Sequence, residues 1–128
     1  MMPMTRVSLK KGKSAEYKRA ISDNIYEAMR ETFNCPEDDQ FILISEHEDG
    51  DFHYSKNYLD IARTDDLVFI QITCNNTRTL EMKKALYKRL VERLAVALRL
   101  RPEDVFISLV EVEKENWSLG KGEAQYAQ

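Results

Sequence analysis

The feature that most constrains the fold is an internal repeat. A Pro-Glu-Asp tripeptide occurs at Pro36–Asp38 and again at Pro102–Asp104, 66 residues later, each time shortly before an apolar run. Upstream, Ser14–Lys18 has its counterpart in Thr79–Lys83, 65 residues later. This period is too long for a solenoid, and two copies indicate a duplicated supersecondary unit.

Each copy has the pattern of a strand, a helix and a second strand. In the first copy, a strand is predicted at Met4–Leu9, and the Ser14 hydroxyl can cap the helix that follows by accepting from first-turn N–H groups. Apolar residues three and four positions apart over Tyr17–Phe33 indicate one buried helix face. A proline follows this helix, and Phe41–Ser45 is predicted to be the second strand.

The second copy repeats this layout. A strand rich in β-branched and aromatic residues is predicted at Leu67–Thr73, and Thr79 caps a helix with apolar residues through Leu98. The last strand is predicted at Val105–Val110. The chain 1–128 is therefore expected to be one α/β domain. Its parts are a βαβ half over 3–46, a polar insertion over 47–66, a βαβ half over 67–112, and a tail over 113–128 that is irregular or a short hairpin.

Two βαβ units predict a four-stranded sheet with both helices on one face. A right-handed crossover makes the strands within each half parallel. The predicted strands 67–73 and 105–110 are apolar on both faces, and such strands need both faces buried. Two helices cover only one face, so the second cover is expected from another subunit in a homo-oligomer.

Composition narrows the class of protein. The net charge of −3, from 19 basic and 22 acidic residues, argues against a nucleic-acid-binding protein. No apolar run reaches the length of a membrane span, and no signal-peptide pattern opens the chain. Cys35 and Cys74 form neither a disulfide framework nor a CxxC pair, so no metal or redox cofactor is expected. The cytoplasm is the default compartment.

Pro3 is the first candidate for chemistry. Inside a chain it is only a proline near the start of a strand, where its missing N–H is harmless. At a free terminus its nitrogen is a secondary amine, which titrates in the α-amino range of about 7.7 to 8.0. An apolar pocket and a nearby cation both lower such a pKa towards that of a usable general base. The residues alone leave both alternatives open.

Arg78 and Asp39 are the other candidates. Arg78 follows the third predicted strand and stands one residue before Thr79, where a guanidinium can grip a substrate carboxylate. An exposed loop arginine is the alternative. Asp39 lies at a loop-to-strand junction, where an aspartate commonly serves as a turn or capping residue.

Several segments together resemble the tautomerase superfamily. They are Pro3 at the head of a strand, Pro36–Asp39, Ile61–Thr64 and the late Glu115–Gly122. The branch they resemble is that of malonate semialdehyde decarboxylase and its small bacterial relatives, and the resemblance covers nearly the whole chain. It implies a homotrimer of two-βαβ subunits, with an amino-terminal proline in each active site and a small carboxylate-bearing substrate.

The resemblance also assigns roles to residues. It implies that Pro3 is the catalytic proline, that Asp39 activates water or assists proton transfer, and that Arg78 binds the substrate carboxylate. A mostly aromatic wall would come from the tail, and subunit packing is the alternative role for these residues. The residues that match the wall are Trp117, Leu119 and Tyr126.

Two departures bear on the reaction. Asn76 stands where the decarboxylase pattern has a second substrate-binding arginine, and an amide cannot supply equivalent electrostatic stabilisation. Leu119 replaces an aromatic residue of the wall. These changes favour a cofactor-free keto–enol tautomerase acting on phenylpyruvate-like 2-oxo or enol acids. The alternatives are a decarboxylase or hydratase of small oxo acids such as malonate semialdehyde, and a non-catalytic trimeric binding module.

The first two residues affect the role of Pro3. Methionine aminopeptidases remove a methionine that precedes a small residue such as proline, but they are not expected to clear Met1 ahead of Met2. The working hypothesis is that translation starts at Met2, so that processing exposes the Pro3 amine. If both methionines stay, Pro3 is an amide and this mechanism is closed.

Overall fold

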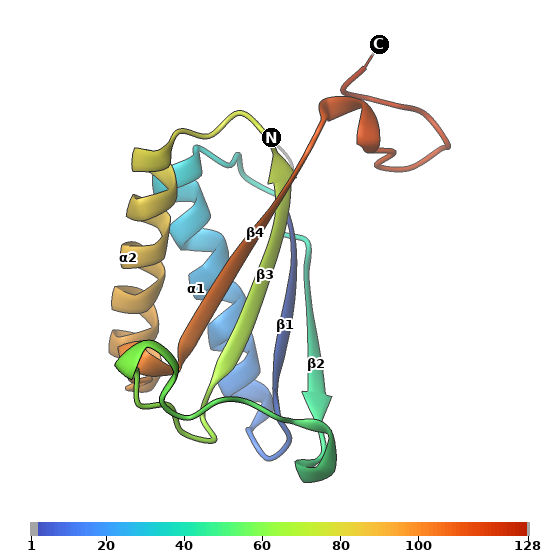
Figure 1. Ribbon diagram of the computed structural model, residues 1–128. Coiled ribbons are helices and arrows are strands. Elements are labelled where there is room, and N and C mark those ends of the chain that lie inside the picture. The colour runs from blue at the N-terminus through green and yellow to red at the C-terminus, as the bar shows by residue number, and fades with distance from the viewer. Residues whose placement is uncertain (1–2, 128) are drawn as a thin grey trace.

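The two copies of the repeat form two β-α-β units in the computed structural model, which describes residues 3–127 (Figure 1). Met1 and Met2, on which the processing hypothesis depends, lie outside the described residues. The predicted strands and helices are confirmed, with strand ends that differ by one or two residues. The elements are β1 (Met4–Lys10), α1 (Ala15–Phe33), β2 (Ile42–His47), β3 (Val68–Asn75), α2 (Leu80–Leu98) and β4 (Val105–Val112).

Both helices begin at the predicted caps. The Ser14 hydroxyl accepts a hydrogen bond of 3.0 Å from the backbone N–H of Tyr17. The Thr79 hydroxyl accepts one of 3.2 Å from Met82. Each bond satisfies one of the N–H groups that a helix leaves unpaired in its first turn. The equivalent caps place the start of each helix at the same point of the repeat.

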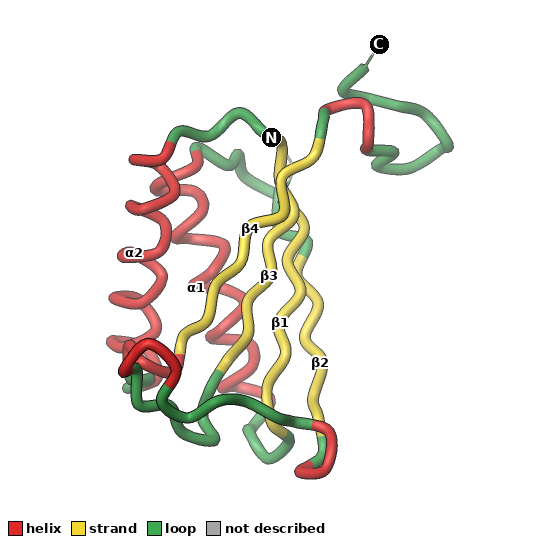
Figure 2. The backbone as a smooth tube through the Cα atoms, viewed as in Figure 1, coloured by secondary structure: helices red, strands yellow, loops and turns green. Residues whose placement is uncertain are grey.

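The sheet has the strand order β2-β1-β3-β4 (Figure 2). The strands of each half are parallel, as the crossover rule predicts, and the two halves meet through an antiparallel β1–β3 pair. In that pair Met4 lies opposite Thr73. The start of β1 therefore lies beside the end of β3, which brings the segments that carry the candidate residues Pro3 and Arg78 to the same end of the sheet.

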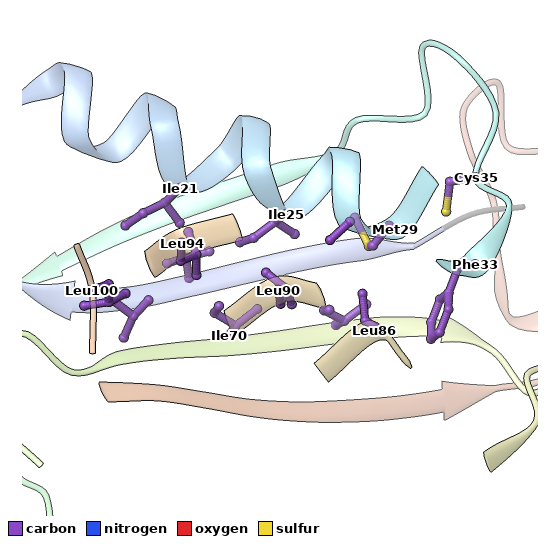
Figure 3. Close-up of a cluster of buried hydrophobic side chains, with 14 of the residues drawn as sticks. Ile21, Ile25, Met29, Phe33, Cys35, Ile70, Leu86, Leu90, Leu94 and Leu100 are labelled. Carbon is purple, nitrogen blue, oxygen red and sulfur yellow. The ribbon is translucent and has the colours of Figure 1, made fainter. Parts of the chain in front are cut away.

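Both helices lie on the same face of the sheet, as predicted (Figure 1). Their apolar faces and the inward side chains of β1 and β3 form the core, and Phe33 and Cys35 lie at one end of it (Figure 3). Fully buried members of this core include Val7, Leu9, Ile21, Ile25, Met29, Ile70, Ile72, Leu86, Leu90 and Leu94.

The other face of the sheet is only partly covered. Phe52 of the insertion packs edge-on against Phe69 of β3 with ring centroids 5.7 Å apart, and Phe69 lies 5.1 Å from Phe106 of β4. Leu43 and Phe106 remain 54% and 45% exposed. The expectation that another subunit supplies the whole second cover is thus wrong in part, because the insertion of the same chain folds over Phe69.

The insertion is fastened to the second half of the repeat. Asp104, which is 0% exposed, accepts hydrogen bonds from the backbone N–H of Thr64 at 2.7 Å and from its hydroxyl at 2.6 Å. The equivalent residue of the first half, Asp38, is exposed and has a positive φ of 62°. The two Pro-Glu-Asp segments therefore differ in structure, because only Asp104 meets a partner from the insertion.

The tail continues from β4 past the end of the sheet (Figure 1). Its regular structure is a 3-10 turn over Lys114–Asn116, followed by turns. No strand forms among residues 113–127, so the irregular alternative is confirmed and the hairpin alternative is wrong. Over residues 3–127, neither helix has the length and apolar character needed to cross a membrane.

Candidate active site

Three chain segments meet at one edge of the sheet. Thr5 of β1 pairs with Ile42 at the start of the parallel strand β2, so the segment before β2 lies beside the start of β1. The antiparallel β1–β3 pair brings the end of β3 to the same edge. The structure thus places Pro3, Asp39 and Arg78 at this edge, and all three are buried.

Arg78 is the most unusual of these residues. Its side chain is 6% exposed, and its Nε and both Nη atoms are buried with no hydrogen-bond partner among residues 3–127. Its Cζ atom lies 4.8 Å from the centroid of the Phe33 ring, a favourable cation–π contact. Leaving buried charged donors unpaired is costly. The site is therefore suited to an anion that supplies the missing acceptors, such as a carboxylate.

The positive charge of Arg78 affects the pKa values of its neighbours. Burial raises the pKa of the Asp39 carboxyl, and the positive charge of Arg78 acts against this shift. Burial also raises the pKa of the Cys35 and Cys74 thiols, and Arg78 again acts in the opposite direction. The positive charge of Arg78 thus acts to lower the pKa values of one carboxyl and two thiols at this edge of the sheet. The same charge favours the binding of an anion there.

The tail is attached to the end of β3 through two asparagines. Trp117 Nε1 donates a hydrogen bond of 2.7 Å to Asn75 Oδ1. Asn76 Nδ2 donates one of 2.8 Å to Glu113 Oε1, so its amide is engaged with the tail. Trp117 is thereby held beside the segment that carries Arg78.

The other two predicted wall residues lie further along the tail. Leu119 is exposed, and its backbone N–H donates to Gln125 Oε1 at 2.8 Å. Tyr126 is half-buried. The proposed substrate-binding roles of Asn76, Trp117, Leu119 and Tyr126 stay predictions.

Two residues of this edge were missed from the sequence. The spacing of apolar residues predicts only that Phe33 belongs to the buried face of its helix. The feature that could have distinguished it is its position as the last residue of that helix. Asn75 precedes Asn76 and Arg78, yet nothing in the sequence distinguished the buried asparagine from its exposed neighbour. Its burial follows from the pairing of β3 with β4, which continues through Asn75.

A separate hollow of about 470 Å³ lies at the opposite end of β3. Its lining includes Tyr58 of the insertion together with Phe69 and Phe106 of the open sheet face. Pro3, Asp39 and Arg78 are not part of its lining. Among the described residues, no group of three or more His, Cys, Asp or Glu side chains could hold a metal ion.

Comparison with protein families identifies the class. A family model described as "Tautomerase enzyme" matches residues 39–120, and a second model of that description matches residues 3–58. The chain is 41% identical to the probable tautomerase YusQ of Bacillus subtilis (strain 168), over 97% of this chain and 98% of that protein. It is 30% identical to the probable tautomerase YrdN of the same organism, over 98% of this chain and 96% of that one. The chain belongs to the tautomerase family.

Solved structures share the fold. FG41 malonate semialdehyde decarboxylase inhibited by 3-bromopropiolate is 31% identical, with a TM-score of 0.90 over 96% of this chain and 93% of that one. A symmetric trimer of wild-type fused 4-OT is 18% identical, with a TM-score of 0.78 over 97% of this chain and 98% of that one. The first is also a relative in sequence, whereas the second shows the fold alone.

Proposed function

We propose that the protein is a cofactor-free keto–enol tautomerase acting on small 2-oxo or enol carboxylic acids such as phenylenolpyruvate. The observation that carries the proposal is the buried Arg78 guanidinium, whose three nitrogens find no hydrogen-bond partner among the described residues. A substrate carboxylate would supply two acceptors in the fork geometry that a guanidinium matches. Membership of the tautomerase family supports the class of reaction.

In this proposal the amine of Pro3 is the general base. It takes the proton from the enol hydroxyl of phenylenolpyruvate, the carbonyl forms, and the same proton is returned to the adjacent carbon. A secondary amine has a pKa near the operating pH, and the nearby positive charge of Arg78 favours its neutral form. Asp39 would orient the developing carbonyl or a water, and the Trp117 end of the tail would exclude solvent.

The proposal requires a free amine at Pro3. Translation from Met2 followed by removal of that methionine would provide it. The intact mass of the natively expressed protein tests this step, and a mass that begins at Pro3 is expected. A mass that retains both methionines together with full turnover would show that the base is another group.

The central test is ultraviolet-monitored ketonisation of phenylenolpyruvate. We expect Pro3→Ala to lose about 10²- to 10⁴-fold in kcat, the usual contribution of a positioned base. Arg78→Met is expected mainly to raise KM, because it removes the carboxylate anchor. Arg19→Met, at an exposed helix position, is the matched control for Arg78 and is expected to leave the kinetics unchanged. Full activity of Pro3→Ala would refute the mechanism.

A decarboxylase or hydratase of small oxo acids is the second candidate. The similarity to malonate semialdehyde decarboxylase favours it. The hydrogen bond from Asn76 to Glu113 argues against it, because the residue at this position is an amide engaged with the tail. Release of carbon dioxide from malonate semialdehyde would establish the decarboxylase, and Asn76→Arg is then expected to increase its rate.

The proposal includes assembly into a homotrimer. The exposed Leu43 and Phe106 on the uncovered sheet face support an interface between copies, and a fused 4-OT of the same fold is a trimer. Light scattering coupled to size exclusion measures the mass directly. A trimer that binds an aromatic keto acid without turnover would instead support a non-catalytic binding module.

A further inference from the structure

Phe33 is the aromatic neighbour of the buried Arg78 guanidinium. No carboxylate of the described residues pairs with Arg78: its three nitrogens are buried without a geometrically well-formed hydrogen bond, and the polar neighbour that interacts with the guanidinium is the weakly polar Cys35 thiol. The aromatic contact that it does make is with the Phe33 ring, 4.8 Å from the guanidinium carbon. A cation is attracted to the face of an aromatic ring, and this attraction is strongest where both groups are removed from water.

The ring itself is held firmly. Phe33 is the last residue of α1 and is 1% exposed, and it lies at the end of the core beside Cys35 (Figure 3). The next residue, Asn34, has a left-handed backbone, and its N–H bonds the Met29 carbonyl. The Cys35 N–H bonds the same carbonyl at 3.4 Å. These two bonds end the helix at a defined point and fix the backbone that carries the ring.

We propose that Phe33 is a positioning residue, which holds the Arg78 guanidinium so that its N–H groups face an incoming carboxylate. The inference rests on the proposed function, because that function supplies the carboxylate. Orientation by a ring face uses none of the N–H groups, whereas a salt bridge to the protein would occupy some of them. A preorganised guanidinium also loses less side-chain entropy when the ligand binds.

The test changes the ring electrostatics without changing its shape. Phenylalanines with one, two and three ring fluorines are incorporated at Phe33, since fluorine weakens the negative face of the ring. We expect KM for phenylenolpyruvate, and the dissociation constant of benzoate as an unreactive carboxylate, to rise stepwise to about tenfold. The kcat value should change little, because the contact acts on binding in both ground and transition state. Fluorination at Phe52, whose ring packs against Phe69 of the same chain, is the control and should change neither constant.

A second variant and a spectroscopic readout complete the experiment. Phe33→Leu is expected to raise KM as strongly and to move the Nε–H signal of Arg78 in the NMR spectrum, because the ring current is lost. Ile25→Val, in the same helix, controls for a loss of core packing and should leave that signal and KM in place. Constants unaffected by fluorination at Phe33 would overturn the inference. If the wild-type protein shows no turnover, the proposed function fails, and the benzoate affinities of the same variants still decide the role of Phe33.

Discussion

Removing the Asp104 carboxylate is expected to destabilise the protein severely. Asp104 is fully buried and accepts two hydrogen bonds from Thr64, and Arg101 Nη1 lies 3.6 Å from its Oδ2 atom. A hydrogen bond to a charged group contributes about 1.5–3 kcal/mol to stability. The exposed Arg101 adds at most about 1 kcal/mol. Asp104→Ala removes both bonds and the ion pair, and is therefore expected to lower the free energy of unfolding by about 3–7 kcal/mol.

Asp104→Asn removes the negative charge of the side chain and keeps its shape. The amide oxygen can still accept from the Thr64 N–H, and the amide nitrogen can donate to the Thr64 hydroxyl if the hydroxyl turns. Both contacts with Thr64 are then kept, but between neutral groups, so the free energy of unfolding is expected to fall by only about 1–2 kcal/mol. Thr64→Val deletes the hydroxyl bond to Asp104 and also the 3.2 Å bond that the Asp66 backbone N–H donates to that hydroxyl, so it should cost about 2–4 kcal/mol.

The assay is urea unfolding at fixed protein concentration, because the proposed homotrimer would make the apparent stability depend on concentration. The double variant Thr64→Val/Asp104→Asn closes a thermodynamic cycle and measures the coupling between the two side chains. The repeat provides a matched control, because Asp38→Asn makes the same change at the equivalent exposed position. It should stay within about 0.5 kcal/mol of wild type. Equal stabilities for Asp104→Ala and wild type would refute the assignment of this contact as a structural clamp.

Three further predictions follow from the candidate site and the helix caps. Burial raises the pKa of Asp39 in the folded state above its ordinary 3.8, so the protein loses stability as the pH rises from 3.8 through the folded-state pKa. Between about pH 4 and pH 7, the urea midpoint of Asp39→Asn should therefore increase relative to that of wild type. Parallel midpoint curves for the two proteins would contradict this. Arg78→Met should raise the pKa of Asp39 further, as followed by NMR titration of its carboxyl carbon, because the opposing positive charge is removed. Ser14→Ala and Thr79→Ala should each lower the unfolding free energy by about 1 kcal/mol, and a cap with no effect on the urea midpoint would contradict its hydrogen bond.

Local chemistry in the sequence determined the elements of the fold. The Ser14 and Thr79 hydroxyls, the three-and-four spacing of apolar residues and the prolines after each helix act within a few residues of the chain, so their effects are readable from it. Parallel pairing within each half followed from the handedness of the crossover. Pro3, Asp39 and Arg78 were singled out by position and residue type, and their functional roles stay predictions.

The sequence repeat predicted that the two halves have the same elements, but it did not predict that equivalent residues have the same surroundings. Asp38 and Asp104 occupy the same place in the repeat, yet one is exposed and the other is fully buried. The difference arises from Thr64, which lies 40 residues before Asp104 in a segment that the first half lacks. Contacts of this kind depend on where the insertion folds, and the repeat carries no information about it.

What the sequence by itself determined is the set of two β-α-β units and the residues capable of chemistry. Only the tertiary structure decided that the halves join through an antiparallel β1–β3 pair, with Met4 opposite Thr73. A parallel pair would have set the start of β1 at the far end of β3 from Arg78. The packing of α1 likewise decided that Phe33 lies against Arg78. Both results depend on long-range contacts, in which strand order and helix packing minimise the apolar surface left in water across the whole chain.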